Sequence, residues 1–251
     1  MTYQPVFGSY NLPKALWAGS ISMARRVPMA NSARYDGAHT LTGLLNLKKI
    51  SMRGTLIRPL GTTTANYLRS LLDGLHGGLS QGPCNFYLES DRYWRNCQHE
   101  AYSDDYDATS LRNYVNVSFD IVTGDPFSYE TATTTGSGSI TSTGGTKTCV
   151  NAGNAKAAPV ITIVVGTTGT NTLSITNSTN GDACSITGAF TSGDSIEIDC
   201  LNLTVKKNGT ALMTIFDGQF PRLDVGSNSV VFAKSAGSYT SVAVAWANRY
   251  Y

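Results

Sequence analysis

The sequence predicts a mainly β fold of two domains, the first of which carries a single α-helix. Residues 47–58 and 113–127 alternate apolar and polar side chains, the period of a half-buried strand. Residues 62–78 instead place leucines at helical spacing. In the second half of the chain, turn dipeptides such as Asn180-Gly181 recur at short intervals, which is typical of a sandwich of short strands.

The first of these segments has two unlike faces. Its apolar face holds Ile50, Met52, Gly54 and Leu56, and its polar, partly basic face holds Lys49, Ser51, Arg53 and Thr55. The leucines at positions 68, 71, 72 and 75 then share one helix face. Thr63 or Thr64 is the expected N-cap, and Gly77-Gly78 is the expected end of the helix.

Residues 84–102 predict a hairpin that turns at Ser90-Asp91-Arg92 and carries aromatic side chains, which usually pack across strands. Cys84 and Cys97 flank this hairpin and could face one another across it as a disulfide. The five cysteines are an odd number without a C-x-x-C pair, so the sequence indicates neither a zinc site nor a complete disulfide framework. Because cytoplasmic synthesis favours reduced thiols, we expect small buried cysteines.

A change in composition marks the domain boundary. Residues 131–148 are rich in Thr, Ser and Gly and contain Lys147 as their one charge, so we predict domains of residues 1–130 and 131–251. In the second domain the apolar positions of residues 195–210 change from even, at Ile196 and Ile198, to odd, at Leu201, Leu203 and Val205. One strand cannot do both without a bulge or turn, so we expect linked antiparallel strands that end at Asn208-Gly209.

Charge and motifs argue against catalysis and against nucleic-acid specificity. The formal net charge is +2 and charged residues make up 14% of the chain, so there is no basic footprint. The histidines, His39, His76 and His99, lie in no metal-binding or nucleophile motif, and no glycine loop has the setting that phosphate binding requires. We therefore expect no catalytic residue, no cofactor and no metal.

An acidic cluster and the hydropathy of the chain point to no metal site and to no membrane segment. Asp104, Asp105 and Asp107 could supply oxygens to calcium, but the glycine and glutamate of a calcium loop are missing, so a solvated loop is favoured. No segment approaches the roughly 20 apolar residues of a membrane helix, and the opening residues lack the apolar region of a signal peptide. We expect a soluble protein without membrane insertion.

The order of several motifs resembles distal tail proteins of long, flexible-tailed bacteriophages of the siphovirus type. The first part of the resemblance is the strand "KKISMRGTLIR", the leucine helix, the aromatic hairpin and "NVSFDIVTGDPFSYE". The second part is the series "CVNAGNAKAAPVITI", "GDSIEIDC", "TVKKNGT" and "DGQFPRLDVGSN". The resemblance spans about residues 45–251. The first 45 residues, with Arg25-Arg26, match no pattern of the family, and our hypothesis for them is an arm or loop that contacts the tail tube.

The resemblance implies a structural virion protein at the phage tail tip, assembled in the host cytoplasm. Residues 1–130 would be a β-sandwich or barrel-like domain with one helix that forms a ring, usually a hexamer, around the DNA channel. Residues 131–251 would be a galectin-like β-sandwich that points outward. The implied partners are copies of the chain in a homohexameric ring, the tail tube protein, a tail tip or hub protein, receptor-binding or side-fibre proteins, and phage DNA that passes without sequence-specific binding.

The residues for these contacts are open to more than one interpretation. Lys49, Arg53 and Arg58 are the candidates for ring contacts, and a plain solvated strand face is the alternative. A carbohydrate-binding module is a second hypothesis for the whole protein, with Tyr239, Tyr250 and Tyr251 as the residues that would stack on a sugar. A stacked tail-tube protein is the third, and it differs from a hub because tube subunits form open-ended stacks.

Overall fold

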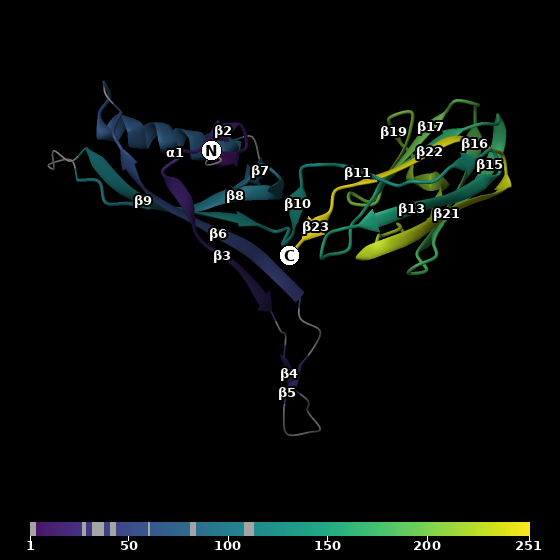
Figure 1. Ribbon diagram of the computed structural model, residues 1–251, viewed down its shortest axis with the longest axis horizontal. Helices are drawn as coiled ribbons and strands as arrows, with labels where there is room; N and C mark the ends of the chain where they lie inside the picture. The colour runs from purple at the N-terminus through teal and green to yellow at the C-terminus, as the bar shows by residue number, and fades with distance from the viewer. Residues whose placement is uncertain are drawn as a thin grey trace. The chain divides into compact units, whose positions relative to one another are not determined.

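The computed structural model describes residues 4–26, 29–31, 38–40, 44–59, 61–80, 84–107 and 113–251, with side chains described outside 17–47 and 76–80. The side chains of His39, His76 and the Arg25-Arg26 pair therefore lie outside the described residues. The chain divides into two compact units, Met1–Tyr129 and Glu130–Tyr251 (Figure 1). The predicted mainly β class is confirmed, and α1 (Thr64–Ser80) is the α-helix of the described part of the chain.

The first unit is an antiparallel sheet backed by α1. The sheet has the strand order β2-β1-β7-β8-β9-β6-β3. Its strands are β1 (Val6–Phe7), β2 (Tyr10–Asn11), β3 (Leu16–Arg26), β6 (Leu44–Ile57), β7 (Cys84–Tyr87), β8 (Arg92–Asp104) and β9 (Tyr114–Thr123). Between β3 and β6 the chain forms a separate hairpin of β4 (Met29–Asn31) and β5 (Ala38–Thr40). β10 (Ser128–Glu130) spans the division between the units.

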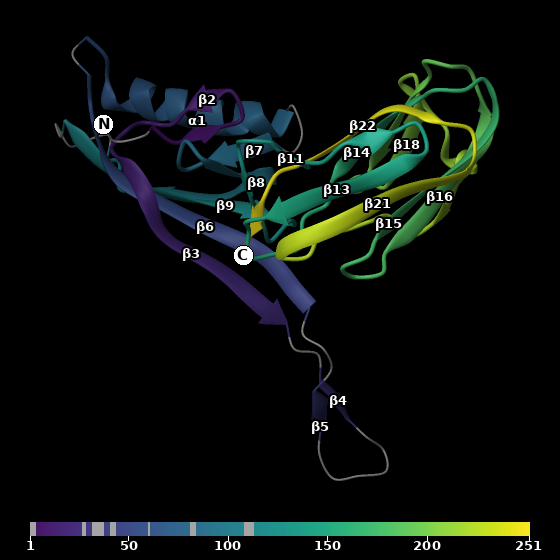
Figure 2. The same cartoon turned by 45° about the vertical axis from the view of Figure 1, so that its right-hand side comes forward.

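The helix covers one face of this sheet, because its leucines and the even positions of β6 share one core (Figure 2). Leu68, Leu71 and Leu75 are buried against a cluster that includes Ile50, Met52, Leu56, Val115, Phe119 and Trp94. Thr63 caps the helix as predicted: its Oγ1 accepts a hydrogen bond from the Asn66 N–H at 3.2 Å. The predicted end at Gly77-Gly78 is wrong, since the helix continues to Ser80.

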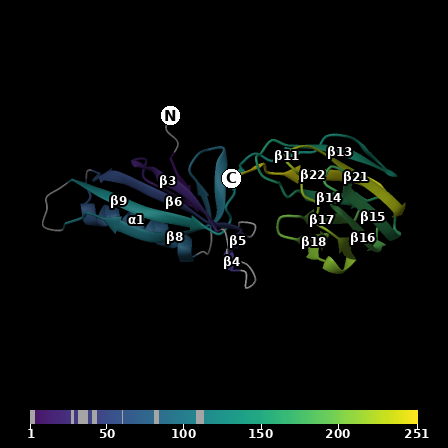
Figure 3. The ribbon, with the colours of Figure 1, turned by 90° about the horizontal axis from the view of Figure 1, so that it is seen from below.

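The second unit is a β-sandwich, as predicted (Figure 3). One sheet has the order β11-β22-β14-β17-β18-β19 and the other β12-β13-β21-β15-β16-β20. The first sheet comprises β11 (Thr134–Thr135), β14 (Val160–Val165), β17 (Ser195–Asp199), β18 (Thr204–Lys207), β19 (Thr210–Ala211) and β22 (Tyr239–Trp246). The second comprises β12 (Ile140–Thr141), β13 (Gly144–Asn151), β15 (Gly169–Asn177), β16 (Ala183–Phe190), β20 (Phe216–Gly218) and β21 (Gly226–Ala236). A short 3-10 helix, η1 (Met213–Ile215), and β23 (Arg249–Tyr250) complete the unit.

Both sheets contribute to one core, which includes Ile161, Ile163, Leu173, Ile186, Phe232 and Trp246. The linked antiparallel strands predicted for residues 195–210 are confirmed, since β17 pairs with β18 and β18 with β19. The change of phase is a turn, in which Leu203 has a φ of 55°. Leu203 is 53% exposed, so it does not lie on a buried strand face as the apolar pattern of residues 201–205 had predicted. Asn208 and Gly209 take φ angles of 48° and 80°, the left-handed pair that a tight hairpin turn needs.

Candidate functional site

The sheet of the first unit has a second face on which, among the described residues, no helix packs. We call it the open face and define it by Lys49, Ser51, Arg53 and Thr55 of β6 with Asn116, Ser118 and Asp120 of β9. These side chains are exposed or half-buried, whereas those at the intervening positions are buried. The alternation predicted for residues 47–58 is therefore confirmed.

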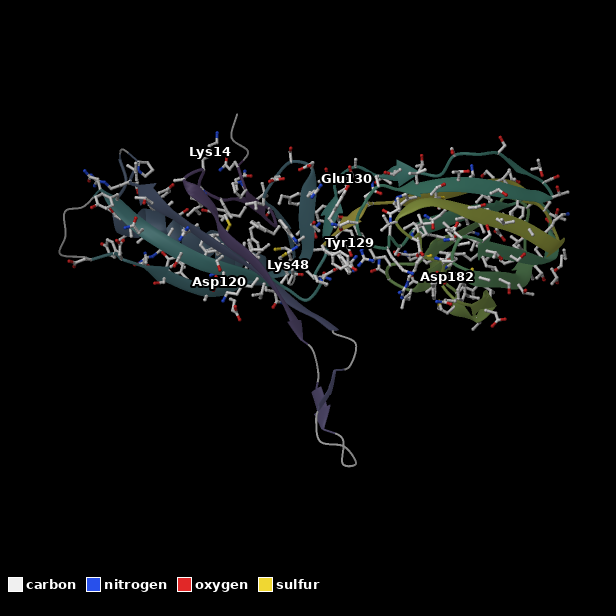
Figure 4. The ribbon with its side chains drawn as sticks, turned by 60° about the horizontal axis from the view of Figure 1, so that its bottom comes forward. Lys14, Lys48, Asp120, Tyr129, Glu130 and Asp182 are labelled. Carbon is white, nitrogen blue, oxygen red and sulfur yellow. The ribbon has the colours of Figure 1, made fainter. Side chains whose placement is uncertain are left out.

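An ionic and hydroxyl cluster occupies one part of the open face. Lys49 Nζ lies 2.7 Å from Asp120 Oδ2 and 3.5 Å from Glu100 Oε2, and Ser51 Oγ donates to Asp120 Oδ1 at 2.7 Å. Figure 4 labels Asp120, the acceptor at the centre of this cluster. Burial opposes ionisation of Asp120, yet the hydrogen bonds from Lys49 and Ser51 hold its pKa below the ordinary value. The hydrogen bond to Asp120 likewise raises the pKa of Lys49. Lys49 is thus engaged within its own sheet.

A second cluster lies further along the same strands. Thr55 Oγ1 donates to Asn116 Oδ1 at 2.6 Å. The backbone N–H and Nδ2 of Asn116 donate to the two carboxylate oxygens of Asp105 at 2.7 and 2.8 Å. Arg53, Asp104 and Asp105 line a hollow beside these residues. Asp105 is therefore tied to the sheet as a hydrogen-bond acceptor for β9, whereas Asp104 accepts from the Tyr106 N–H at 2.9 Å.

Arg53 and Arg58 differ from Lys49 because both are exposed and neither has an ion pair with any residue that the structure describes. Arg58 follows the end of β6, where its backbone N–H donates to Asn113 O at 2.7 Å. Lys49 and Arg53 thus both lie on the open face. Among the described residues, only Lys49 of these two has a carboxylate at ion-pair distance.

The open face ends in an apolar pair that the sequence analysis missed. Ile57 and Tyr114 are cross-strand partners, and they are 71% and 47% exposed. Ile57 follows the odd positions 49–55 of β6, which are polar. That break in the alternation is the signal by which this pair could have been found.

The sheet also has a long edge strand. β3 pairs with β6 from Leu16, opposite Gly54, to Arg26, opposite Leu44, and it is the last strand in the order of the sheet. The other side of β3 has no strand partner within the described residues. Eleven residues is a long edge, and natural proteins usually cover or shorten such edges because they pair readily with other strands.

The three tyrosines considered for glycan stacking have different settings. Tyr239 is 3% exposed, packs edge-on against Phe232, and hydrogen bonds to Ala233 O, so its ring belongs to the core and is no surface platform. Tyr250 is half-buried, and Tyr251 is 56% exposed. The structure therefore leaves at most the last two residues available to a sugar. Trp246, predicted as core, is buried at 3% exposure.

Buried asparagines were also missed. Asn228 Nδ2 donates to Asp224 O at 2.8 Å and to Gly226 O at 3.0 Å, while its Oδ1 accepts from the Asp224 N–H at 2.9 Å. Asn177 Nδ2 reaches Arg222 O at 2.7 Å, and Asn151 Nδ2 reaches Leu223 O at 3.2 Å. These amides satisfy backbone groups of residues 222–226, so part of the "DGQFPRLDVGSN" motif is held by structural asparagines.

Within the part of the chain that the structure describes, no three His, Cys, Asp or Glu side chains gather in a way that could hold a metal ion. None of the described helices is long and apolar enough to cross a membrane. Within the described residues, the first unit thus combines an open sheet face with an unpaired strand edge, two features through which proteins often contact one another.

One family model matches the second unit. Residues 152–250 match the model of the siphovirus-type tail component, C-terminal domain. The second unit is therefore similar to the C-terminal domain of siphovirus-type tail components. This confirms the resemblance found in the motifs. No curated protein matches the chain.

One solved structure supports the fold of the whole chain. The chain is similar to the Dit protein of phage SPP1, whose crystal structure is described as a paradigm of the hub adsorption apparatus in phages that infect Gram-positive bacteria. The identity is 14%, the TM-score is 0.74, and 99% of each chain is covered. A chain of the phage P2 baseplate in its activated conformation with calcium has 9% identity, a TM-score of 0.45, and coverage of 93% of this chain and 90% of that one.

Proposed function

We propose that the protein forms a homohexameric ring at the distal end of a phage tail and connects the tail tube to the tip or baseplate. In this proposal the first unit makes the ring and surrounds the DNA channel. The second unit offers docking sites for host-adsorption proteins, including receptor-binding or side-fibre proteins. The protein is then a structural part of the virion without catalysis.

The observation that carries the proposal is the combination of open face and free edge strand in the first unit. A closed ring needs two different surfaces on each subunit, because each copy contacts one neighbour with one surface and the other neighbour with the second. β3 can supply one surface by strand addition, and the open face with Ile57 and Tyr114 can supply the other. The family model that matches the second unit supports the setting in a tail.

Charge is compatible with a channel through which DNA slides. Residues 1–130 contain twelve Lys and Arg against eleven Asp and Glu. A strongly cationic wall would release counterions from DNA and hold it, whereas a nearly neutral wall lets it pass.

The test is negative-stain imaging of the purified full chain and of two charge reversals. We expect closed six-fold rings for the native chain. Arg53→Glu places a negative charge beside Asp104 and Asp105 on the open face, so we expect it to lower the fraction of rings several-fold. Lys234→Glu is the matched control, because Lys234 is exposed on β21 of the second unit and should leave the rings intact.

Open-ended tubes would favour a stacked tail-tube protein. Single particles of one chain would overturn the ring, and binding of the chain to a glycan array, lost in Tyr251→Ala, would then favour the carbohydrate-binding module. Equal loss of rings in both charge reversals would show that the open face is not the contact.

A further inference from the structure

Two cysteines of the first unit face each other without forming a disulfide. Cys84 of β7 and Cys97 of β8 are register partners, and both are free thiols. We propose that this pair is an oxidation site, at which a low-molecular-weight disulfide such as oxidised glutathione converts the two thiols to a cross-strand disulfide. The proposal rests on the geometry of the hairpin and does not depend on the ring.

Strand pairing places Cys84 opposite Cys97, beside a register shift that lies between Cys84 and Phe86. Directly opposed residues of antiparallel strands have Cα atoms about 4.5–5.5 Å apart, within the range of about 4.4–6.8 Å seen across disulfides. Both side chains also lie on the same side of the sheet, since Cys97 belongs to the core under α1 and Cys84 packs against that core. Cys84 Sγ lies 3.6 Å from Cys97 O, so this sulfur already reaches over the partner residue.

The two thiols differ in access, which sets the order of reaction. Cys97 is 1% exposed, whereas Cys84 is half-buried at the rim of the core. Burial raises the pKa of Cys84, and burial, with the neighbouring Cys84 thiol, raises the pKa of Cys97 to about 12. Because thiolates are the reacting species, oxidation at neutral pH is slow and begins at Cys84.

The reaction balances with one molecule of oxidant. The Cys84 thiolate attacks one sulfur of oxidised glutathione and displaces one glutathione thiolate, which leaves a mixed disulfide. The Cys97 thiolate then attacks Cys84 Sγ and displaces the second glutathione. Two cysteine thiols are oxidised, one glutathione disulfide is reduced, and the two cysteine protons end on the two released glutathiones.

The other cysteines provide an internal contrast. Cys184 lies on β16 and is 5% exposed, and Cys200 follows β17 in the opposite sheet and is 3% exposed. They belong to different sheets and are not register partners, so no hairpin aligns their backbones as it does for Cys84 and Cys97. Cys149, the remaining cysteine, is fully buried on β13. We therefore expect oxidation to be confined to the first unit.

The disulfide would cross-link β7 to β8. The hairpin of these two strands places Phe86 and Trp94 in the core beneath α1, where their rings stack with centroids 6.1 Å apart. A link between residues 84 and 97 restricts the unfolded chain and leaves these contacts in place. We expect the oxidised protein to have a higher melting temperature for the first unit, by several degrees.

The test is a redox titration of the full chain in glutathione buffers of increasing oxidised fraction. The protein is then unfolded with an alkylating reagent and analysed by intact mass and peptide mapping. We expect two of the five thiols to become inaccessible to alkylation, with residues 84 and 97 in one linked peptide. Cys97→Ser should instead accumulate a glutathione adduct on Cys84, and Cys184→Ser should behave like the native chain.

Three results would overturn the proposal. All five thiols could remain alkylated at the highest oxidised fraction, the linked peptide could contain another cysteine, or Cys84→Ser could still lose two thiols. The melting temperature in reducing buffer checks that each variant is folded, and Cys→Ala versions replace any that is not. A melting temperature that does not rise on oxidation would refute the stabilising role of the bond.

Discussion

At the scale of single residues, Gly237 lies so close to a buried side chain that its position tolerates no side chain of its own. Gly237 has φ +82°, and a Cβ placed there would lie only 1.5 Å from Asn171 Oδ1. Asn171 is fully buried, and its Nδ2 donates to Thr167 O at 2.9 Å and to Gly169 O at 3.0 Å. The sequence shows the glycine but not its neighbour, because Asn171 is 66 positions away along the chain.

We predict that Gly237→Ala lowers the free energy of unfolding of the second unit by about 3 kcal/mol or more, since it combines a strained φ with the loss of buried hydrogen bonds. Gly193→Ala is the control, because Gly193 has a similar φ of +95° but nothing within 4 Å of its Cβ position. It should cost only roughly 1–2 kcal/mol. Guanidinium unfolding measures both, and equal losses would refute the role of Asn171.

Asp194 predicts a dependence of stability on pH. Its carboxylate accepts hydrogen bonds from Lys207 Nζ at 2.8 Å, from the Thr191 N–H at 2.7 Å and from Asn208 Nδ2 at 2.8 Å. The bond from Lys207, followed by the other two, lowers the pKa of Asp194 to about 2.

Because the folded pKa lies below the unfolded value of about 3.9, this stabilisation is complete above pH 4 and is lost as pH falls toward 2. We predict that Asp194→Asn is less stable than the native chain at pH 6 and that the difference shrinks between pH 4 and pH 2. Urea midpoints over this range measure it, with Asp217→Asn, on an exposed carboxylate, as the control. A difference that stays constant down to pH 2 would contradict the assignment.

At the scale of elements, alternation predicted strands wherever one face is solvated. Residues 47–58 and 113–127 were found for this reason, and β6 and β9 follow the predicted pattern. β3 escaped the sequence analysis because its register with β6 shifts twice, between Ala18 and Ser20 and between Met23 and Arg25, so its alternation does not persist. The open face could be predicted as polar, but its ion pair with Glu100 of β8 and its hydrogen bonds to Asp105 depend on the pairing of strands distant in sequence.

The pairing of β3 with β6 depends on the absence of a side chain at Gly54. A Cβ at this position would lie 2.2 Å from Ala15 O, next to the start of β3. We predict that Gly54→Ala displaces this end of β3 and speeds amide hydrogen exchange in residues 16–26, with a fall in ring formation. Ser118→Ala is the control, since Ser118 is exposed on the open face and its substitution leaves the pairing of β3 with β6 unchanged. Unchanged exchange in Gly54→Ala would refute the close approach.

At the scale of the whole molecule, the fold class and the resemblance could be derived from the sequence, whereas the surfaces could not. Turn dipeptides predicted a sandwich for the second unit, their order resembled that of tail components, and the match of residues 152–250 agrees. The exposed Ile57 and Tyr114, the free edge of β3 and the buried Tyr239 all depend on which strands lie side by side. A single sequence does not specify that arrangement.

The most direct test of the central claim is the mass of the native full chain in solution by light scattering. We predict a single species of six times the 26.8 kDa of one chain, stable to dilution, because a closed ring has no free surfaces left to add further copies. A stable species of one chain, or a mass that grows without limit as concentration rises, would contradict a closed tail-hub ring.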